Sequence, residues 1–257
     1  MSALIRRFFI ALQFFTCIPI PRWVGFEADW LKHAAGFFPL IGLVVGALTA
    51  AVFAVCAHWL PLPVAIVLSM AAGAYLTRAM HEDGFADVCD GFGGGWERER
   101  VLAIMKDSCV GSFGLTGMLL MLGLKFACLT TLPATALVPA LLLAHPLSRF
   151  MATLLIWRLD YARPGESKAR AVAEHMSGAD VALAVCAGLL PTLALAAWLG
   201  LTGRALAAAC AFALVATLWL ARLFVRRIGG YTGDCLGAVQ QVSEVAVYLG
   251  LLAMLNH

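Results

Sequence analysis

Long apolar stretches alternate with short polar stretches along most of the chain. A bilayer core of roughly 30 Å needs about 20 apolar residues per helix, and seven stretches approach or exceed that length. They cover residues 36–57, 64–80, 110–132, 136–157, 181–201, 205–224 and 236–255. The pattern predicts an all-α fold, namely a polytopic membrane helix bundle of about seven transmembrane helices.

The N-terminal segment, residues 4–20, is apolar but also carries Arg6, Arg7, Gln13 and Thr16. These polar positions fit an interfacial or re-entrant helix at least as well as an eighth span. The segment resembles a signal peptide in outline, yet it has no small-residue cleavage site near its end, so we expect it to be retained. We expect residues 1–257 to form a single integral membrane domain.

Composition supports the membrane assignment and excludes several other classes. Apolar residues make up 62% of the chain and charged residues 13%, with a mean hydropathy of +0.90. A soluble domain contains far more charge. The formal charge of +3 is too small to indicate a nucleic-acid partner. The eight cysteines include no C-x-x-C pair, which argues against a structural zinc site or a disulfide framework.

The basic residues predict how the bundle is oriented. Threading the seven stretches alternately across a bilayer places all the long polar segments on one side and three short turns on the other. Of the 18 Lys and Arg residues, only Arg204 falls in a short turn. The positive-inside rule therefore places the long segments in the cytoplasm, as expected for a multi-pass protein of the bacterial cytoplasmic (inner) membrane.

An acidic segment rich in glycine follows the second apolar stretch. Asp83, Asp87 and Asp90 are spaced i, i+4 and i+7, so on a helix their carboxylates would share one face. Mg²⁺ would relieve the repulsion between them and still leave positions for phosphate oxygens. Asp107 could complete the cluster from a neighbouring segment. The alternative is an ordinary solvated loop beside the membrane.

A second glycine-rich segment precedes the last apolar stretch. It contains Thr232, Gly233 and Asp234, and Arg226 and Arg227 lie shortly before it. A glycine-rich turn that leads into a helix presents free amide groups to an anion, so this segment is a candidate for phosphate recognition or a further metal ligand. A tight turn with basic residues that anchor the membrane face explains the arginines equally well.

Ionisable residues inside apolar stretches are costly and usually functional. Arg149 and Glu244 lie about two turns inside their stretches, where both could line a cavity beside the acidic segment. For Lys125 an internal ion pair or snorkelling fits better. The segment 158–180, which contains Arg163, could cover the site or simply be a solvated connector. A transporter or channel is a further reading of these intramembrane charges.

Taken together, the motifs resemble those of the cobalamin-5′-phosphate synthase family, also called adenosylcobinamide-GDP ribazoletransferases. The likeness extends over nearly the whole chain. The residues that carry it are His81, Asp83, Gly84, Ala86, Asp87, Asp90, Gly91, Asp107, Gly111, Thr232, Gly233, Asp234, Leu236, Gly237 and Ala238, together with residues 14–21 and 38–42.

The resemblance implies a Mg²⁺-dependent enzyme that joins adenosylcobinamide-GDP to α-ribazole or α-ribazole 5′-phosphate and releases GMP. It also implies association with membrane lipid, with other membrane enzymes of the pathway or with further copies of the chain. On this basis the site residues are assigned as catalytic (His81, Asp83, Asp87, Asp90, Arg149), metal-binding (Asp83, Asp87, Asp90, Asp107) and substrate-binding (Gly91, Arg226, Arg227, Thr232, Gly233, Asp234, Glu244).

The nearest competing enzyme class is the CDP-alcohol phosphotransferases, which also place several aspartates on Mg²⁺. The segment from Asp87 through Asp90 to Gly91 is similar to the beginning of their motif. That motif continues with Ala-Arg and two further aspartates, whereas Gly94, Gly95 and Trp96 follow here. Related chemistry is the most that this partial match supports.

Overall fold

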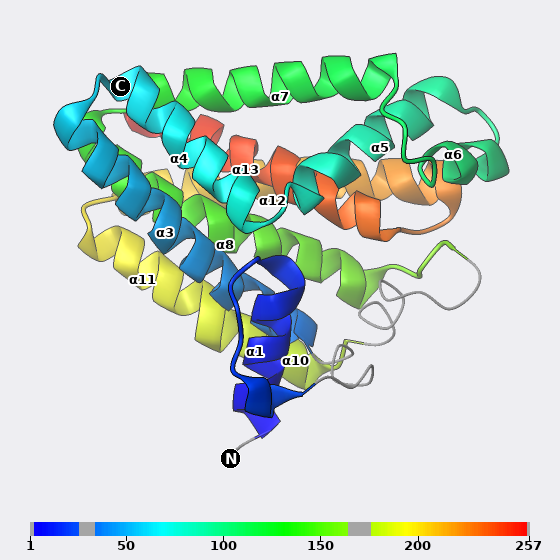
Figure 1. Ribbon diagram of the computed structural model, residues 1–257, viewed down its shortest axis with the longest axis horizontal. Helices are drawn as coiled ribbons and strands as arrows, with labels where there is room; N and C mark the ends of the chain where they lie inside the picture. The colour runs from blue at the N-terminus through cyan, green and yellow to red at the C-terminus, as the bar shows by residue number, and fades with distance from the viewer. Residues whose placement is uncertain (1–2, 26–33, 164–175, 256–257) are drawn as a thin grey trace.

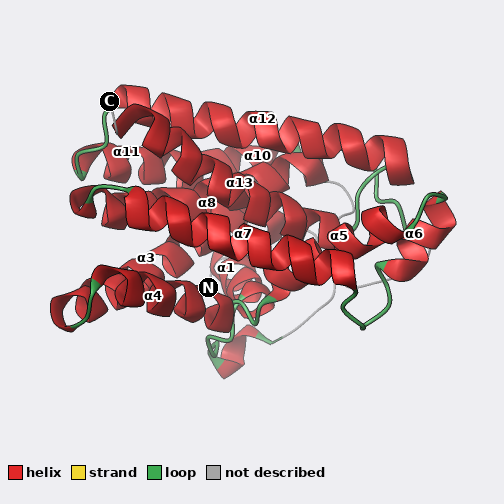
Figure 2. Cartoon of the chain, turned by 90° about the horizontal axis from the view of Figure 1, so that it is seen from above, coloured by secondary structure: helices red, strands yellow, loops and turns green. Residues whose placement is uncertain are grey.

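The computed structural model describes residues 3–25, 34–163 and 176–255, and these residues fold as an all-α bundle. Within these ranges there is no strand, and the only β pairing is an isolated bridge between Tyr161 and Tyr231. The long helices run side by side in both views of the chain (Figures 1 and 2). The predicted all-α membrane bundle is confirmed.

Six helical segments among the described residues are long and apolar enough to cross a bilayer, and they agree with six of the seven predicted stretches. One of them, Gly178–Trp198, is assembled from α10 (Gly178–Leu183), a π-helical turn (Ala184–Leu189) and α11 (Leu190–Trp198). The others are α3 (Phe38–Trp59) with the preceding turn Ala34–Phe37, α7 (Ser112–Thr131), α8 (Ala134–Arg158), α12 (Gly203–Ile228) and α13 (Gly233–Leu255).

The seventh predicted stretch, residues 64–80, is a broken helix rather than a straight span. Helix α4 (Leu62–Leu76) and helix α5 (Met80–Gly94) meet at an angle of 87°. Arg78 and Ala79 take left-handed backbone angles between them, with φ of 55° and 51°. Because α5 carries four acidic residues, a straight continuation would bury charge in hydrocarbon. We therefore count α5 as lying outside the membrane-spanning segments.

Helix α1 (Ala3–Phe15) has 13 residues and is therefore about 20 Å long, too short to span a bilayer. It runs across the bundle rather than along it (Figure 1). Ile10, Ala11 and Phe15 are buried against the other helices. The interfacial or re-entrant reading of the N-terminal segment therefore holds, and the reading as an eighth span does not.

Helices α8 and α13 form the centre of the bundle. In their most apolar windows 83% and 67% of the residues are buried, compared with 22% for α7. Glycine allows α3 to touch α8, because a Cβ atom at Gly42 would lie 2.5 Å from the His145 carbonyl oxygen and 2.6 Å from Pro146 Cα. A side chain at position 42 would force the two helices apart.

We therefore expect Gly42→Ala to destabilise the protein by about 1–3 kcal/mol, as overpacking of a close contact does. The measurement is thermal unfolding in nanodiscs. Gly123→Ala on α7 is the matched control, because a Cβ atom there would meet nothing within 4 Å. Equal stability of the two variants would contradict the tight contact between α3 and α8.

Candidate functional site

The site is built where α5 crosses the beginning of α13. Two glycines make this crossing close. A Cβ atom at Gly84 would lie 3.0 Å from Asp234 Cα, and one at Gly237 would lie 3.0 Å from the His81 carbonyl oxygen. Because the two helices approach so closely, the acidic face of α5 comes to lie beside the N-terminus of α13.

Carboxylates from both helices gather at this crossing. Burial, together with the negative charges of Asp234 and Asp83, raises the pKa of Asp87 to about 7. Asp83 is exposed, and Asp87 and Asp234 are half-buried. The arrangement concentrates negative charge at one accessible place, which is the condition that favours a bound dication.

Arg163 offsets part of this charge and was not among the assigned site residues. Its guanidinium donates to Asp234 Oδ2 at 2.7 Å and to the Met105 carbonyl oxygen at 3.2 Å. The only signal in the sequence was its place in the segment expected to cover the site. Residues 164–175 of that segment lie outside the described residues.

Asp90 and Asp107 are engaged differently from Asp83 and Asp87. Asp90 is buried, and its carboxylate oxygens accept the amide hydrogens of Gly111 at 2.7 Å and Gly114 at 2.8 Å, at the N-terminus of α7. Asp107 is exposed and accepts the amide hydrogen of Cys109. Over the described ranges, no group of three or more His, Cys, Asp or Glu side chains is arranged to hold a metal ion by itself. The metal assignments of these aspartates stay predictions.

A cavity of about 220 Å³, here called the outer groove, opens beside the carboxylates. One wall is apolar and comes from α1, α3 and the beginning of α5, whereas the other is polar. The apolar wall contains Phe14, Phe15, Phe38 and Met80, and the polar wall contains His81, Asp83, Arg149, Asp234 and Gln240. The fold thus places His81, Asp83, Arg149 and Asp234, which were assigned from the sequence, around one cavity.

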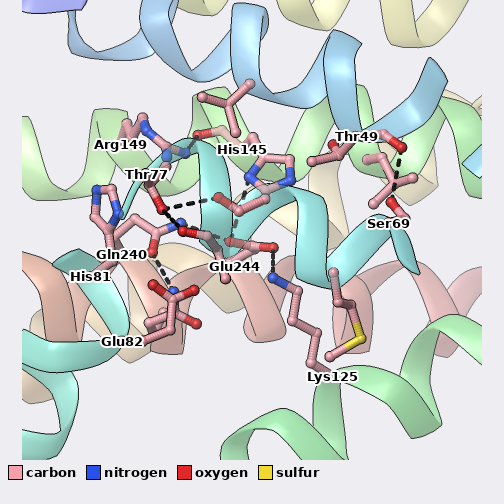
Figure 3. A pocket seen from close by; sticks show the side chains of 16 residues that line it. Thr49, Ser69, Thr77, His81, Glu82, Lys125, His145, Arg149, Gln240 and Glu244 are labelled. Atoms are coloured by element: carbon pink, nitrogen blue, oxygen red, sulfur yellow. Dashed lines mark hydrogen bonds and ion pairs between the residues drawn. The ribbon is translucent and has the colours of Figure 1, made fainter. Parts of the chain in front are cut away.

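A second cavity of about 20 Å³, here called the inner chamber, lies deeper between the helices (Figure 3). His81, Arg149 and Gln240 border both cavities and so form the wall between them. The inner chamber is also lined by Glu82, Gln241 and Glu244. Glu244 therefore lies behind the outer groove, one layer away from any substrate bound there.

The Glu244 carboxylate is fully engaged inside the bundle. Lys125 Nζ lies 2.5 Å from Oε1, Gln240 donates to Oε2 at 2.7 Å, and the Tyr248 hydroxyl donates to Oε1 at 3.1 Å. His145 Nδ1 lies 3.6 Å from Oε2. Of the two possibilities for Lys125, an internal ion pair or snorkelling, the ion pair is confirmed, and these contacts give Glu244 internal partners.

The second glycine-rich segment forms the predicted turn into a helix. Helix α12 ends at Ile228 and is capped by Gly229, whose φ of 76° is left-handed, and α13 begins at Gly233. The Thr232 hydroxyl accepts the Cys235 amide hydrogen at 3.4 Å and donates to Asp234 Oδ2 at 3.3 Å. Thr232 is buried, and Gly233 lines the outer groove.

Of the three remaining assigned residues, Arg227 and Gly91 have structural contacts of their own. Arg227 donates to the carbonyl oxygens of Phe92 and Gly95 at the end of α5, and Arg226 is exposed. A Cβ atom at Gly91 would lie 2.5 Å from Met105 Cγ, so this glycine allows close packing. These contacts explain Arg227 and Gly91 without substrate, and the assignment of all three residues to substrate binding stays a prediction.

Comparisons with known proteins point to one family. The family model described as cobalamin-5-phosphate synthase matches residues 7–252. A protein of Leptothrix cholodnii named adenosylcobinamide-GDP ribazoletransferase is 46% identical over 98% of both chains. Proteins with the same name from Shewanella frigidimarina and Ralstonia nicotianae are 43% and 45% identical, over 96% of this chain and 94% and 95% of theirs. No solved structure matches.

The contacts of Asp90 predict a structural effect of its removal. Asp90→Ala leaves the Gly111 and Gly114 amides unpaired, so we expect a loss of stability of about 1–3 kcal/mol in thermal unfolding. Asp107→Ala is the control. Its carboxylate is exposed, and the change should stay within about 0.5 kcal/mol. A similar loss in both variants would contradict the distinction between the two aspartates.

The Lys125–Glu244 pair predicts a non-additive pair of substitutions. Lys125→Met leaves a buried carboxylate without its cation and should destabilise the protein by about 3–5 kcal/mol. Adding Glu244→Gln removes the charge but keeps hydrogen-bonding atoms for Gln240 and Tyr248, so the double variant should regain much of the loss. Unfolding in nanodiscs measures both. A double variant no more stable than Lys125→Met alone would contradict the pairing.

Proposed function

Because this chain belongs to the cobalamin-5-phosphate synthase family, we propose that it joins adenosylcobinamide-GDP to α-ribazole or α-ribazole 5′-phosphate and releases GMP. The single observation that carries the proposal is the crossing of α5 and α13. There the acidic residues Asp83 and Asp234 share one groove with His81 and Arg149. This combination of anionic and cationic groups suits a reaction at a pyrophosphate.

The reaction exchanges one bond to phosphorus for another. The ribazole hydroxyl oxygen attacks the phosphorus atom bonded to the cobinamide side chain and forms a new P–O bond. The P–O bond to the bridging oxygen breaks, and GMP leaves with the electron pair. Negative charge grows on the phosphate oxygens during this exchange, so rate depends on groups that stabilise it.

We propose that Mg²⁺ serves this reaction and is held by Asp83 and Asp87, with Asp234 as a third contributor. Mg²⁺ usually takes only one or two protein carboxylates and fills its other positions with waters and substrate phosphates, so a complete protein cage is unnecessary. The raised pKa of Asp87 is due first to burial, but the charges of Asp234 and Asp83 contribute to it, and this shared negative charge supports the donor set. When bound, the ion supplies neutralisation of phosphate charge.

Arg149 and His81 face the same groove from α8 and α5. Arg149 is 2% exposed and donates to the His145 carbonyl oxygen at 3.1 Å, so its guanidinium is held in place and can stabilise charge on a transferred phosphate. The His81 ring stacks on Phe15 with 6.0 Å between centroids. We propose that His81 accepts the hydroxyl proton of the nucleophile.

The size of the outer groove limits what it holds. Pockets for drug-sized ligands measure roughly 300–1,000 Å³, whereas this groove measures about 220 Å³. We propose that it binds the pyrophosphate and the adjacent sugar, while the corrinoid ring lies outside, against the aromatic side chains of α1. We also place the protein in the bacterial cytoplasmic membrane with this groove facing the cytoplasm, as the positive-inside rule favours.

The test is GMP release by detergent-purified protein given adenosylcobinamide-GDP, α-ribazole 5′-phosphate and Mg²⁺. We expect release to need all three components and to stop with EDTA. Asp83→Asn should lower the rate by about 100-fold or more, the effect of removing a charge-stabilising group. Glu99→Gln, which changes a carboxylate that is 80% exposed, is the matched control.

Two results would contradict separate parts of the proposal. Release that persists in EDTA and in Asp83→Asn would contradict the metal site while leaving the transferase in place. Well-folded protein that releases no GMP from either ribazole substrate would contradict the transferase itself.

A further inference from the structure

The inner chamber gathers buried polar atoms that lack partners. Five side-chain atoms within the described ranges are buried without a hydrogen-bond partner, and four of them belong to residues that line this chamber. They are Glu82 Oε2, His145 Nδ1, Arg149 Nε and Gln241 Oε1. They come from α5, α8 and α13, so the lining of the chamber belongs to the bundle rather than to one helix.

The chamber has the size and the lining that a buried water requires. Its volume is about 20 Å³, and a cavity needs roughly 10–15 Å³ by this measure to hold one water. A water donates two hydrogen bonds and accepts two. The Glu82 and Gln241 oxygens accept, Arg149 Nε donates, and His145 Nδ1 can donate in one tautomer. The numbers of donors and acceptors among these four atoms therefore equal those that one water can pair.

A metal cation fits the same place poorly. Arg149 Nε carries a hydrogen that cannot face a cation, and the Lys125 ammonium is already present in the chamber wall. The formal charges of Lys125 and Arg149 balance those of Glu82 and Glu244. No further positive charge is needed. A neutral molecule that both donates and accepts hydrogen bonds therefore fits the chamber better than a cation.

We propose that the inner chamber binds one ordered water, which joins Glu82 on α5 to Arg149 on α8 and fixes the guanidinium at the wall of the outer groove. Glu82 is then a positioning residue that acts through this water on Arg149. The consequence for catalysis rests on the proposed function, because Arg149 is the group assigned there to the transferred phosphate. The water site itself stands independently of it.

Gly73 on α4 provides a test that leaves all four atoms intact. It lines the chamber, and a Cβ atom there would lie 3.2 Å from Thr49 Cγ2 and 4.0 Å from His145 Cε1. Gly73→Ala adds a methyl group to the wall of the chamber and so reduces the space for a water. Gly73→Ser adds the same carbon with a hydroxyl that replaces hydrogen bonds of the water. Helix propensity favours alanine over serine, so it opposes the expected order.

We expect Gly73→Ala to lower the unfolding temperature by about 4 °C and to lower kcat for GMP release by about tenfold, with KM little changed. Gly73→Ser should stay close to the unsubstituted protein in both quantities. Gly123→Ala, which adds a methyl group in open space, should match the unsubstituted protein as well. A map at a resolution that shows waters should contain one density in the chamber, and that density should be lost in Gly73→Ala.

Equal effects of Gly73→Ala and Gly73→Ser would overturn the proposal, because volume and not hydrogen bonding would then decide. A high-resolution map without density in the chamber would overturn it as well. If the unsubstituted protein releases no GMP, the proposed function fails, but unfolding temperatures and the map still decide whether the chamber binds water. Failure of the water proposal is thus distinguishable from failure of the proposed transferase activity.

Discussion

The buried carboxylate of Glu244 is the constraint around which the bundle is arranged. A charge in a hydrocarbon-surrounded interior persists only with close partners, and here they come from separate helices. Lys125 extends from α7, His145 from α8, and Gln240 and Tyr248 from α13 itself. A shift of α7 by a turn would separate the Lys125 ammonium from the carboxylate, so this charge helps to fix the position of α7 relative to α13.

The helices joined by these contacts also form the outer groove, which has one apolar wall and one polar wall. Helix α4 lies among apolar neighbours. The break after it sets off α5, whose acidic residues lie at the boundary of the bundle. Gly84 and Gly237 then bring Asp83 and Asp87 beside Asp234. Arg149 arrives from α8, which is held by the same interior contacts. The positions of side chains in the groove therefore depend on contacts inside the bundle.

The sequence alone predicts the apolar helices and the turn before α13 well, because periodicity and length report burial directly. It does not predict the break after Leu76, since Arg78 and Ala79 take left-handed angles without a glycine or proline to signal them. The sequence also gives no reason to distinguish Asp83 from Asp90, and both were assigned the same roles. Their different environments arise from α7, whose first amides reach Asp90 and leave Asp83 exposed. The partner of Lys125 lies more than 100 positions along the chain, and spacing carries no information at that range.

Helix α1 contributes Phe14 and Phe15 to the outer groove although it is too short to be a span. Its place across the bundle matches a helix that rests on the surface of the bilayer. Part of the outer groove is thus completed by a segment of the kind that rests on a lipid surface. A detergent micelle is curved and would support α1 differently from a flat bilayer. The shape of the groove therefore depends on the membrane around the protein.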